Sequence, residues 1–285
     1  MNNGLYALDR SGQSFANYFQ IEQVLYDSRS KYQKITVFDT ADCGRILMLD
    51  NFFNVSTPME AFYHEPMSHV PLGLAGRRRN VLIIGGGDFG VARHVVKHRD
   101  VEALTLCELD GQVLDVCREF FPDWAVCEKD PRMQVRVGDG AAYLKDCPPH
   151  SLDALIIDST DPFFNASVLV TEDFYDAAYR ALQPEGVLIQ IVADYYFYKK
   201  IWPDVLSVIK GHFPACRPLF FYVPFYVLGS WGLLLAGKKR EQLRPEKITR
   251  EYLDSIGGVE TLTPEIVAGA FSLPPYIRNE LKDFL

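Results

Sequence analysis

The alternation of apolar and polar residues changes character near residue 60 of this 285-residue chain. Before that point it consists of the short runs FANYFQIEQVLYD, YQKITVFDT, GRILMLD and NFFNVST, separated by turn-prone pieces such as ADCG. Such runs predict antiparallel β-strands. From residue 61 the spacing becomes helical, and then short apolar runs alternate with helical segments. We therefore predict an N-terminal β-strand domain over residues 1–60 and an α/β domain over residues 61–285.

The larger domain is organised around NVLIIGGGDFGVARHVVKH, which begins at residue 80. An apolar run, three glycines and an amphipathic segment predict the strand, tight turn and helix that open a βαβ unit. Gly85, Gly87 and Gly90 have the G-x-G-x-x-G spacing that lets a ligand approach the backbone closely. Further strands are predicted within residues 103–106, 133–146, 154–157 and 187–192. This alternation predicts a Rossmann-like, methyltransferase-type sheet that is mostly parallel.

The apolar stretch at residues 219–237 has the length of a membrane span. Pro224, Gly229 and Gly232 interrupt it, and it is rich in aromatic and β-branched residues. Two buried strands joined by a turn explain this pattern better, and they would give the sheet an antiparallel end.

Five acidic residues follow predicted strands, where ligands bind in sheets of this kind. They are Asp88, Glu108, Asp139, Asp158 and Asp161. Asp88 would repel the pyrophosphate of a dinucleotide and argues against a dinucleotide oxidoreductase. It suits a cationic sulfonium nucleoside, although Asp at this position also caps helices.

The other acids suit the remaining parts of such a ligand. Glu108 lies about 20 residues past the glycines, where a carboxylate binds a ribose diol. Asp139 and Gly140 suit an adenine, or form only a turn. Asp158 and Asp161 would clamp an ammonium group, and one of them would accept its proton when the amine attacks the carbon beside the sulfonium. The alternative for this pair is a helix cap and a turn.

Composition and charge narrow the function further. The net charge is −8, which argues against nucleic acid as a partner. The six cysteines show no C-x-x-C spacing, which is typical of reduced thiols in the cytoplasm. The N-terminus resembles no signal peptide. His94 and His98 lie four residues apart without a third ligand, so we expect a surface helix face and no metal.

Taken together, FYHEPMSHVPL, VLIIGGGD, VEALTLCELD, DPRMQVRVGDG, IIDSTDP, VPFY with GSW, and AGAFSLPPY resemble the spermidine synthases. These aminopropyltransferases transfer the aminopropyl group of decarboxylated S-adenosylmethionine to a diamine and release 5′-methylthioadenosine. The resemblance implies a β domain before a Rossmann-like domain, a homodimer or homotetramer, and no cofactor besides this co-substrate. It also implies small-molecule substrates without a nucleic-acid or membrane partner.

The same resemblance implies roles for individual residues. Asp158 would be the proton acceptor, and Asp88 would hold the amino end of the aminopropyl arm. Asp161 and Tyr63 would line the amine site, and Tyr226 would close over it. Gln33 and His64 match ligand-contacting positions, Glu108 would bind the ribose, and Asp139 and Gly140 the adenine.

Several positions depart from the family pattern on the side of the acceptor amine and the covering loop. They are Asn54, Met59, Phe89, residues 163–164, residues 190–196, Phe225 and Val227. We therefore expect the usual donor and an acceptor that is longer, bulkier or more apolar than putrescine. Two alternatives stay open: S-adenosylmethionine itself as the donor, which Asp88 opposes, and a nucleoside-binding homologue without catalysis, which Asp158 and Asp161 oppose.

Overall fold

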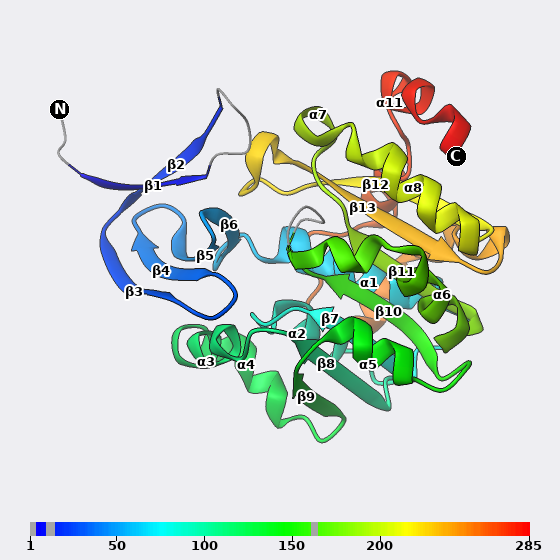
Figure 1. Cartoon of the computed structure of the whole chain (residues 1–285), viewed down its shortest axis with the longest axis horizontal. Helices are drawn as coiled ribbons and strands as arrows, with labels where there is room; N and C mark the ends of the chain where they lie inside the picture. Colours follow the sequence, from blue (N-terminus) through cyan, green and yellow to red (C-terminus); the bar gives the residue numbers. More distant parts are fainter. Residues whose placement is uncertain (1–3, 10–14, 161–164) are drawn as a thin grey trace.

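A seven-stranded sheet forms the centre of the protein, whose computed structural model describes residues 4–9, 15–160 and 165–285 (Figure 1). Its strands are β7 (Asn80–Gly85), β8 (Ala103–Glu108), β9 (Met133–Val137), β10 (Leu152–Asp158), β11 (Leu182–Ile191), β12 (Ala215–Tyr222) and β13 (Ser230–Gly237). The order is β12-β13-β11-β10-β7-β8-β9, and the strands from β11 to β9 are parallel. The predicted fold class is confirmed.

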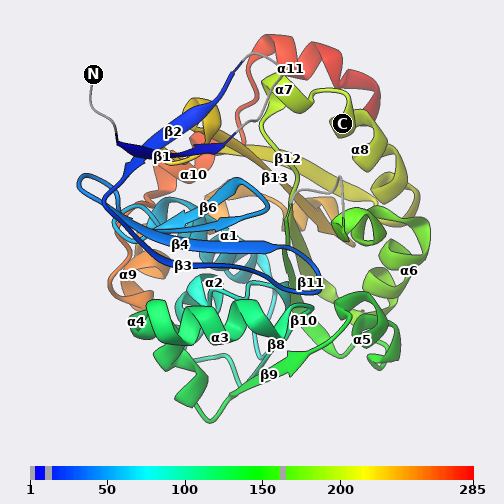
Figure 2. The same cartoon turned by 60° about the vertical axis from the view of Figure 1, so that its left-hand side comes forward.

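Helices cover both faces of this sheet (Figures 1 and 2). In β7, Val81 and Ile83 pack on the same side as α1 (Ala61–Leu74) and α2 (Gly90–Val95). Leu82 and Ile84 point to the other side, towards the core formed with α5 (Gly140–Asp146), α6 (Glu172–Ala181) and α8 (Ile201–His212). Because strand side chains alternate between faces, the continuous apolar run at residues 81–84 serves a sheet buried on both sides.

The remaining helices are shorter and lie around this core. They are α3 (Gly111–Phe120), α4 (Pro122–Ala125), α7 (Tyr195–Tyr198), α9 (Arg250–Ile256), α10 (Pro264–Ala270) and α11 (Pro275–Glu280). Turns of 3₁₀ helix lie at Val126–Lys129, Asn165–Val170, Val227–Gly229, Arg240–Gln242, Pro245–Lys247 and Lys282–Phe284. In the part of the chain that the structure describes, no helix has the length and apolar character needed to cross a bilayer.

The N-terminal segment forms antiparallel strands, as predicted. They are β1 (Leu5–Asp9), β2 (Asn17–Ile21), β3 (Gln23–Arg29), β4 (Lys34–Thr40), β5 (Gly44–Leu49) and β6 (Phe52–Ser56). Ile35, Val37 and Leu47 are fully buried or nearly so and share one core with β7. The division of the chain at residue 60 therefore stays a prediction.

The antiparallel end of the sheet is confirmed. β12 and β13 pair antiparallel across residues 215–237, with Leu219 opposite Leu233. The apolar stretch is therefore a strand pair within the sheet.

The register of β7 and β10 brings the glycine turn to Asp158. Gly85 pairs with Asp158 at the carboxyl ends of the two strands. Gly85 has a φ of +85°, and a Cβ added there would lie 2.1 Å from the Asp158 carbonyl oxygen. Only glycine allows this approach, so the turn and the acid are placed together by the backbone.

Candidate active site

A cavity of about 460 Å³ opens at the carboxyl ends of β7, β8 and β10. The N-terminal sheet supplies part of its wall through Gln33, Leu47, Leu49 and Asn54. This volume is within the range of about 300–1,000 Å³ found for small-molecule sites. The cavity is therefore built between the two sheets, at the edge where the sequence predicts a ligand.

Most of the predicted site residues line this cavity. They are Gln33, Tyr63, Gly85, Gly87, Asp88, Glu108, Asp139, Gly140, Asp158 and Tyr226. His64 lies behind Asp88 and does not line it, and Asp161 lies outside the described residues. The structure thus brings residues from seven separate segments to one cavity.

Asp158 and Tyr63 form a close pair within the cavity. The Tyr63 hydroxyl donates a hydrogen bond of 2.6 Å to Asp158 Oδ1. Burial and the neighbouring charge of Asp88 raise the pKa of Asp158 to about 7, although His64 and the Tyr63 hydrogen bond oppose this change. Asp158 is therefore a base near neutral pH, the range in which general-base catalysis is most effective.

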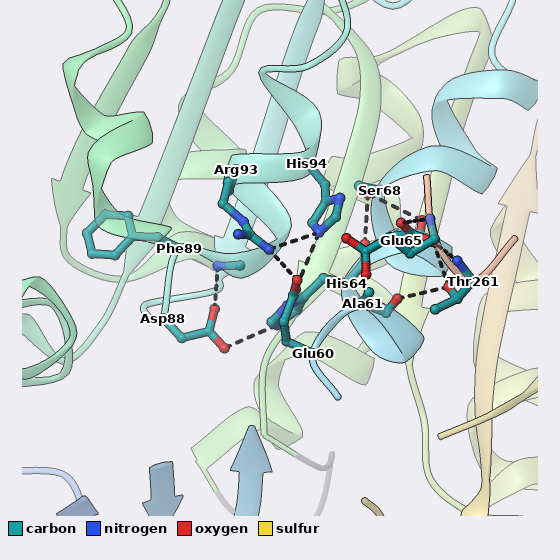
Figure 3. Close-up of polar contacts among 12 residues, drawn as sticks. Glu60, Ala61, His64, Glu65, Ser68, Asp88, Phe89, Arg93, His94 and Thr261 are labelled. Atoms are coloured by element: carbon teal, nitrogen blue, oxygen red, sulfur yellow. Dashed lines mark hydrogen bonds and ion pairs between the residues drawn. The ribbon is translucent and has the colours of Figure 1, made fainter. Parts of the chain in front are cut away.

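The pKa of Asp88 is shifted in the opposite direction from that of Asp158, and Figure 3 shows the contacts of Asp88 that cause this. The amide of Gly90 donates to Asp88 Oδ1 at 2.8 Å, and His64 Nε2 lies 3.3 Å from Asp88 Oδ2. Burial alone would raise the pKa of Asp88, but His64 and Gly90 lower it below its usual range. Asp88 is thus a permanent anion beside a carboxyl that titrates near neutrality.

The side chain of His64 is positively charged and contacts Asp88 from the side away from the cavity. Its Nδ1 lies 2.6 Å from Glu60 Oε2, which is one helical turn earlier on the chain. Burial lowers the pKa of His64, but Asp88 and Glu60 together raise it to about 10. Arg93 and His94 also contact Glu60. Sequence reasoning missed Glu60, although its spacing of four residues from His64 on a predicted helix is a recognisable signal.

Glu108, Asp139 and Gly140 lie on another part of the wall. Glu108 Oε1 accepts the amide of Asp110 at 2.9 Å, and burial raises the pKa of Glu108 to about 7. Asp139 Oδ1 caps α5 by accepting the amides of residues 141 and 142. Asp139 therefore caps a helix and lines the cavity at the same time. A structural role in the turn and a role in ligand binding are compatible for this residue.

Gln33 reaches the cavity from the N-terminal sheet. Its amide nitrogen donates to Asp110 Oδ2 at 3.1 Å, and Ser30 donates to the same oxygen at 2.6 Å. Asp110 also caps α3 through the amide of Gln112. Sequence reasoning missed Asp110, whose side chain fixes the position of Gln33.

Two expectations about individual residues are wrong. Phe89 does not belong to the acceptor side: it is fully buried at a φ of +67°, and the guanidinium carbon of Arg118 lies 5.7 Å from its ring. His94 and His98 are not on a surface face, because they are 2% and 4% exposed. His94 is on α2 and His98 lies just after it, and the His69 ring of α1 packs against both, at 5.2 and 5.1 Å between ring centres.

Comparisons with known proteins agree with this geometry. Residues 60–246 match the family described as the spermine/spermidine synthase domain, and residues 8–56 match the spermidine synthase tetramerisation domain. The polyamine aminopropyltransferase of Moorella thermoacetica is 35% identical over 269 residues, which cover 92% of this chain and 91% of the relative. The spermine synthase of Arabidopsis thaliana is 32% identical over 276 residues, covering 95% and 77% respectively.

Solved structures show the same relationship. A spermidine synthase in complex with the transition state analogue AdoDATO superimposes with a TM-score of 0.92 at 30% identity, covering 99% of this chain and 96% of the other. The spermidine synthase of Thermotoga maritima gives a TM-score of 0.90 at 30% identity, covering 99% and 95%. The motifs, the cavity and these similarities lead to one conclusion: the chain belongs to the spermine/spermidine synthase family of aminopropyltransferases.

Proposed function

We propose that this protein transfers the aminopropyl group of decarboxylated S-adenosylmethionine to an amine and releases 5′-methylthioadenosine. The observation that carries this proposal is the pair Asp88 and Asp158, which line one cavity with different partners, His64 for Asp88 and Tyr63 for Asp158. A fixed anion binds the cationic arm of the donor. A carboxylate with a pKa near 7 binds the acceptor ammonium and takes its proton.

The donor fits the part of the wall formed by Gly87, Glu108, Asp139 and Gly140. We assign the ribose hydroxyls to Glu108 and the adenine to Asp139 and Gly140. A side chain at Gly87 would crowd this wall, because an added Cβ would lie 2.9 Å from Val113 Cγ1 and 3.0 Å from the Glu108 side chain, and both would have to shift. Gln33 closes this region from the N-terminal sheet. The sulfonium carries the positive charge that this acidic wall favours.

In the reaction, the amine nitrogen attacks the carbon attached to the sulfonium sulfur. A C–N bond forms, the C–S bond breaks with its electron pair on sulfur, and the amine loses a proton to Asp158. An ammonium has a pKa of about 10.4 and must be deprotonated to attack. Burial and Asp88 raise the pKa of Asp158 above its ordinary value, which makes it a stronger base for this proton than an exposed carboxylate. The protein lowers the activation barrier further by aligning the attacking nitrogen, the carbon and the sulfur.

Replacing Tyr63 by phenylalanine should move the acidic limb of the kcat/KM profile to higher pH. The Tyr63 hydroxyl stabilises the charged form of Asp158 and thus lowers its pKa. Without this hydrogen bond Asp158 stays protonated, and inactive as a base, up to a higher pH. Rates measured from pH 5.5 to 9.5 test this expectation. Tyr226→Phe is the matched control, because the Tyr226 hydroxyl donates to the Asn54 carbonyl oxygen at 2.8 Å. An acidic limb that stays in place in Tyr63→Phe would refute the role of this contact.

We assign the acceptor amine to the part of the cavity next to Asp158. Asn54, Ile191 and Tyr226 are among the residues that line the cavity. A second cavity of about 60 Å³ shares these three residues, and Phe52, Phe53, Val227 and Trp231 line it together with the polar residues Asp9, Ser159 and Thr160. An amine with a longer or more apolar chain than putrescine would bury part of that chain here. We therefore propose such an amine as the acceptor.

A panel of amines tests both the activity and the acceptor. Decarboxylated S-adenosylmethionine is incubated with putrescine, cadaverine, 1,3-diaminopropane, agmatine, spermidine or no amine, and 5′-methylthioadenosine is measured. We expect release only with an amine, and a higher kcat/KM for an acceptor other than putrescine. Putrescine as the best substrate would refute the altered acceptor and leave the transferase intact. Donor binding without release for any amine would favour a homologue without catalysis.

S-adenosylmethionine as the donor is the main alternative within the same chemistry. Its additional carboxylate would lie near Asp88, which stays ionised, and the two charges would repel each other. Running the panel with each donor separates the two possibilities. We expect turnover with the decarboxylated form only.

We further propose that the protein is a homo-oligomer that assembles through its N-terminal region. Residues 8–56 match a tetramerisation domain. Leu5 and Tyr18, on β1 and β2, are 60% and 66% exposed, and Figure 1 shows this hairpin projecting from the rest of the molecule. Light scattering distinguishes a dimer from a tetramer. The cytoplasmic location stays a prediction.

A further inference from the structure

A cluster of one carboxylate and two imidazoles lies between α1 and α2, and Figure 3 shows two of its members, Glu65 and His94, near Glu60. It consists of Glu65, His69 and His94, which are 0%, 0% and 2% exposed. One ligand atom from each residue lies within 4.8 Å of the other two. The proposed transfer reaction makes no use of these three residues.

Each histidine uses one ring nitrogen, and the other has no hydrogen-bond partner among the residues that the structure describes. His94 Nε2 lies 3.3 Å from Glu60 Oε2 and 3.4 Å from Arg93 Nη2; in the tautomer with the hydrogen on Nε2 it donates to Glu60, and His94 Nδ1 presents a lone pair. His69 Nδ1 is paired with His98 Nε2 at 2.9 Å, and His69 Nε2 has no partner. Burial lowers the pKa of both His69 and His94, so both imidazoles are neutral.

Glu65 retains the capacity for a further ligand. Its Oε2 accepts two hydrogen bonds from Thr261, at 2.8 Å from the amide and 2.6 Å from the hydroxyl. From the described part of the chain, its Oε1 accepts one hydrogen bond, from the amide of Glu260 at 2.7 Å. A carboxylate oxygen accepts about two hydrogen bonds, so one position at Oε1 stays available.

We propose that Glu65, His69 and His94 bind a divalent transition-metal ion of the zinc class. Two neutral imidazoles and one carboxylate are a ligand set that zinc uses, with bonds of about 2.0–2.2 Å. Ligand atoms at such a site lie about 3.4 Å apart, so small side-chain shifts bring the three atoms to coordinating distance. A single water donates only two hydrogen bonds, whereas a cation serves all three acceptors. His98 then has the role of orienting His69, as partners of metal-bound histidines do.

Such an ion would connect α1 to α2 and to the segment at residues 260–261. Through His94 it would also fix Glu60, which supports His64 and Asp88. Its predicted effect is on stability, because a ligand that binds only the folded state raises the melting temperature. The metal and the transferase activity can therefore be tested separately.

The test uses the full chain without an affinity tag. Its metal content is measured by mass spectrometry as purified, and again after unfolding with chelator and refolding with or without Zn²⁺. We expect about one ion per chain and a melting temperature that is higher by roughly 5–10 °C with the metal. Refolding with Co²⁺ should give the visible d–d bands of a nitrogen- and oxygen-ligated site, without the charge-transfer band of a thiolate.

Three variants assign the ion to this cluster. His69→Gln and His94→Gln should lose the ion and the cobalt bands, and His212→Gln, on α8, should retain both. Wild-type protein that takes up no Zn²⁺ or Co²⁺ on refolding would overturn the proposal. In that case, a bound water or an N–H···N hydrogen bond between His69 and His94 would account for the cluster. Retention of the ion in both cluster variants would overturn it as well. If these variants fail to fold, the measurements on wild-type protein decide.

Discussion

Asp158→Asn is expected to lower kcat at least ~100-fold and, at pH 8, to raise the melting temperature of the protein without substrate. General-base catalysis contributes about 10²–10⁴-fold to a rate, and asparagine cannot accept the proton. The second effect arises because the pKa of Asp158 is raised to about 7 by burial, next to Asp88. Activity assays and thermal melts of the same preparations measure both effects.

The sign of the stability effect follows from proton linkage. Between about pH 4 and pH 7 the folded state binds more protons at Asp158 than the unfolded state does, so this residue contributes less stability as the pH rises. Above pH 7 the buried charge costs at least ~1 kcal/mol, and the neutral asparagine removes that cost. The gain in melting temperature should therefore disappear towards pH 4. A variant that loses activity and stability together at pH 8 would contradict this account.

Asp153→Asn is the matched control on the same strand. Asp153 is buried at the opposite end of β10, where Oδ2 accepts the amides of Arg79 and Asn80 at 2.9 and 3.0 Å. An amide in its place loses part of this interaction and should lower the melting temperature. It should leave kcat unchanged. The two aspartates of β10 thus have opposite expected effects.

Asp88→Asn is expected to lower kcat/KM for the decarboxylated donor by ~100-fold while changing the dissociation constant of 5′-methylthioadenosine less than about 3-fold. Truncating one partner of a buried charge pair costs roughly 2–5 kcal/mol. The charge partner of Asp88 is the amino group at the end of the donor's aminopropyl arm. The product 5′-methylthioadenosine lacks this arm. Calorimetry with 5′-methylthioadenosine and steady-state kinetics with the donor give the two numbers.

Asp139→Asn provides the comparison for Asp88→Asn. Asp139 is assigned to the adenine, which donor and product share, so its replacement should weaken both to a similar extent. Equal losses for donor and product in Asp88→Asn would contradict the assignment of the aminopropyl arm. They would show that Asp88 acts on the nucleoside or on the fold of the glycine turn.

Local sequence pattern was sufficient for the parts of this site that depend on neighbouring residues. The alternation in residues 81–84 and the glycines after it predict β7, its turn and α2, because strand and turn geometry are set by adjacent residues. The acids that line the cavity were also predictable. They follow strands, and parallel strands present their carboxyl ends at one edge of a sheet.

Residues brought together from distant segments were not predictable in the same way. Glu60 and His64 support Asp88 only because α1 packs against α2, and His94 and His98 are interior for the same reason. Periodicity assigned α2 one buried face, and it could not show that a second helix covers the other. Phe89, in the glycine turn, is another residue whose surroundings could not be predicted. It departs from the family pattern, and its side chain is buried in the core.

Short-range geometry therefore accounts for the strands that alternate with helical segments, for the glycine turn and for the acids at the strand ends, and all of these could be predicted from the sequence. The ionisation of those acids depends on the folded chain. Asp88 and Asp158 are both aspartates after parallel strands, yet the first is paired with His64 and the second is buried with Tyr63. Their pKa values separate because a pKa depends on burial and on neighbouring charges, which only the folded chain supplies.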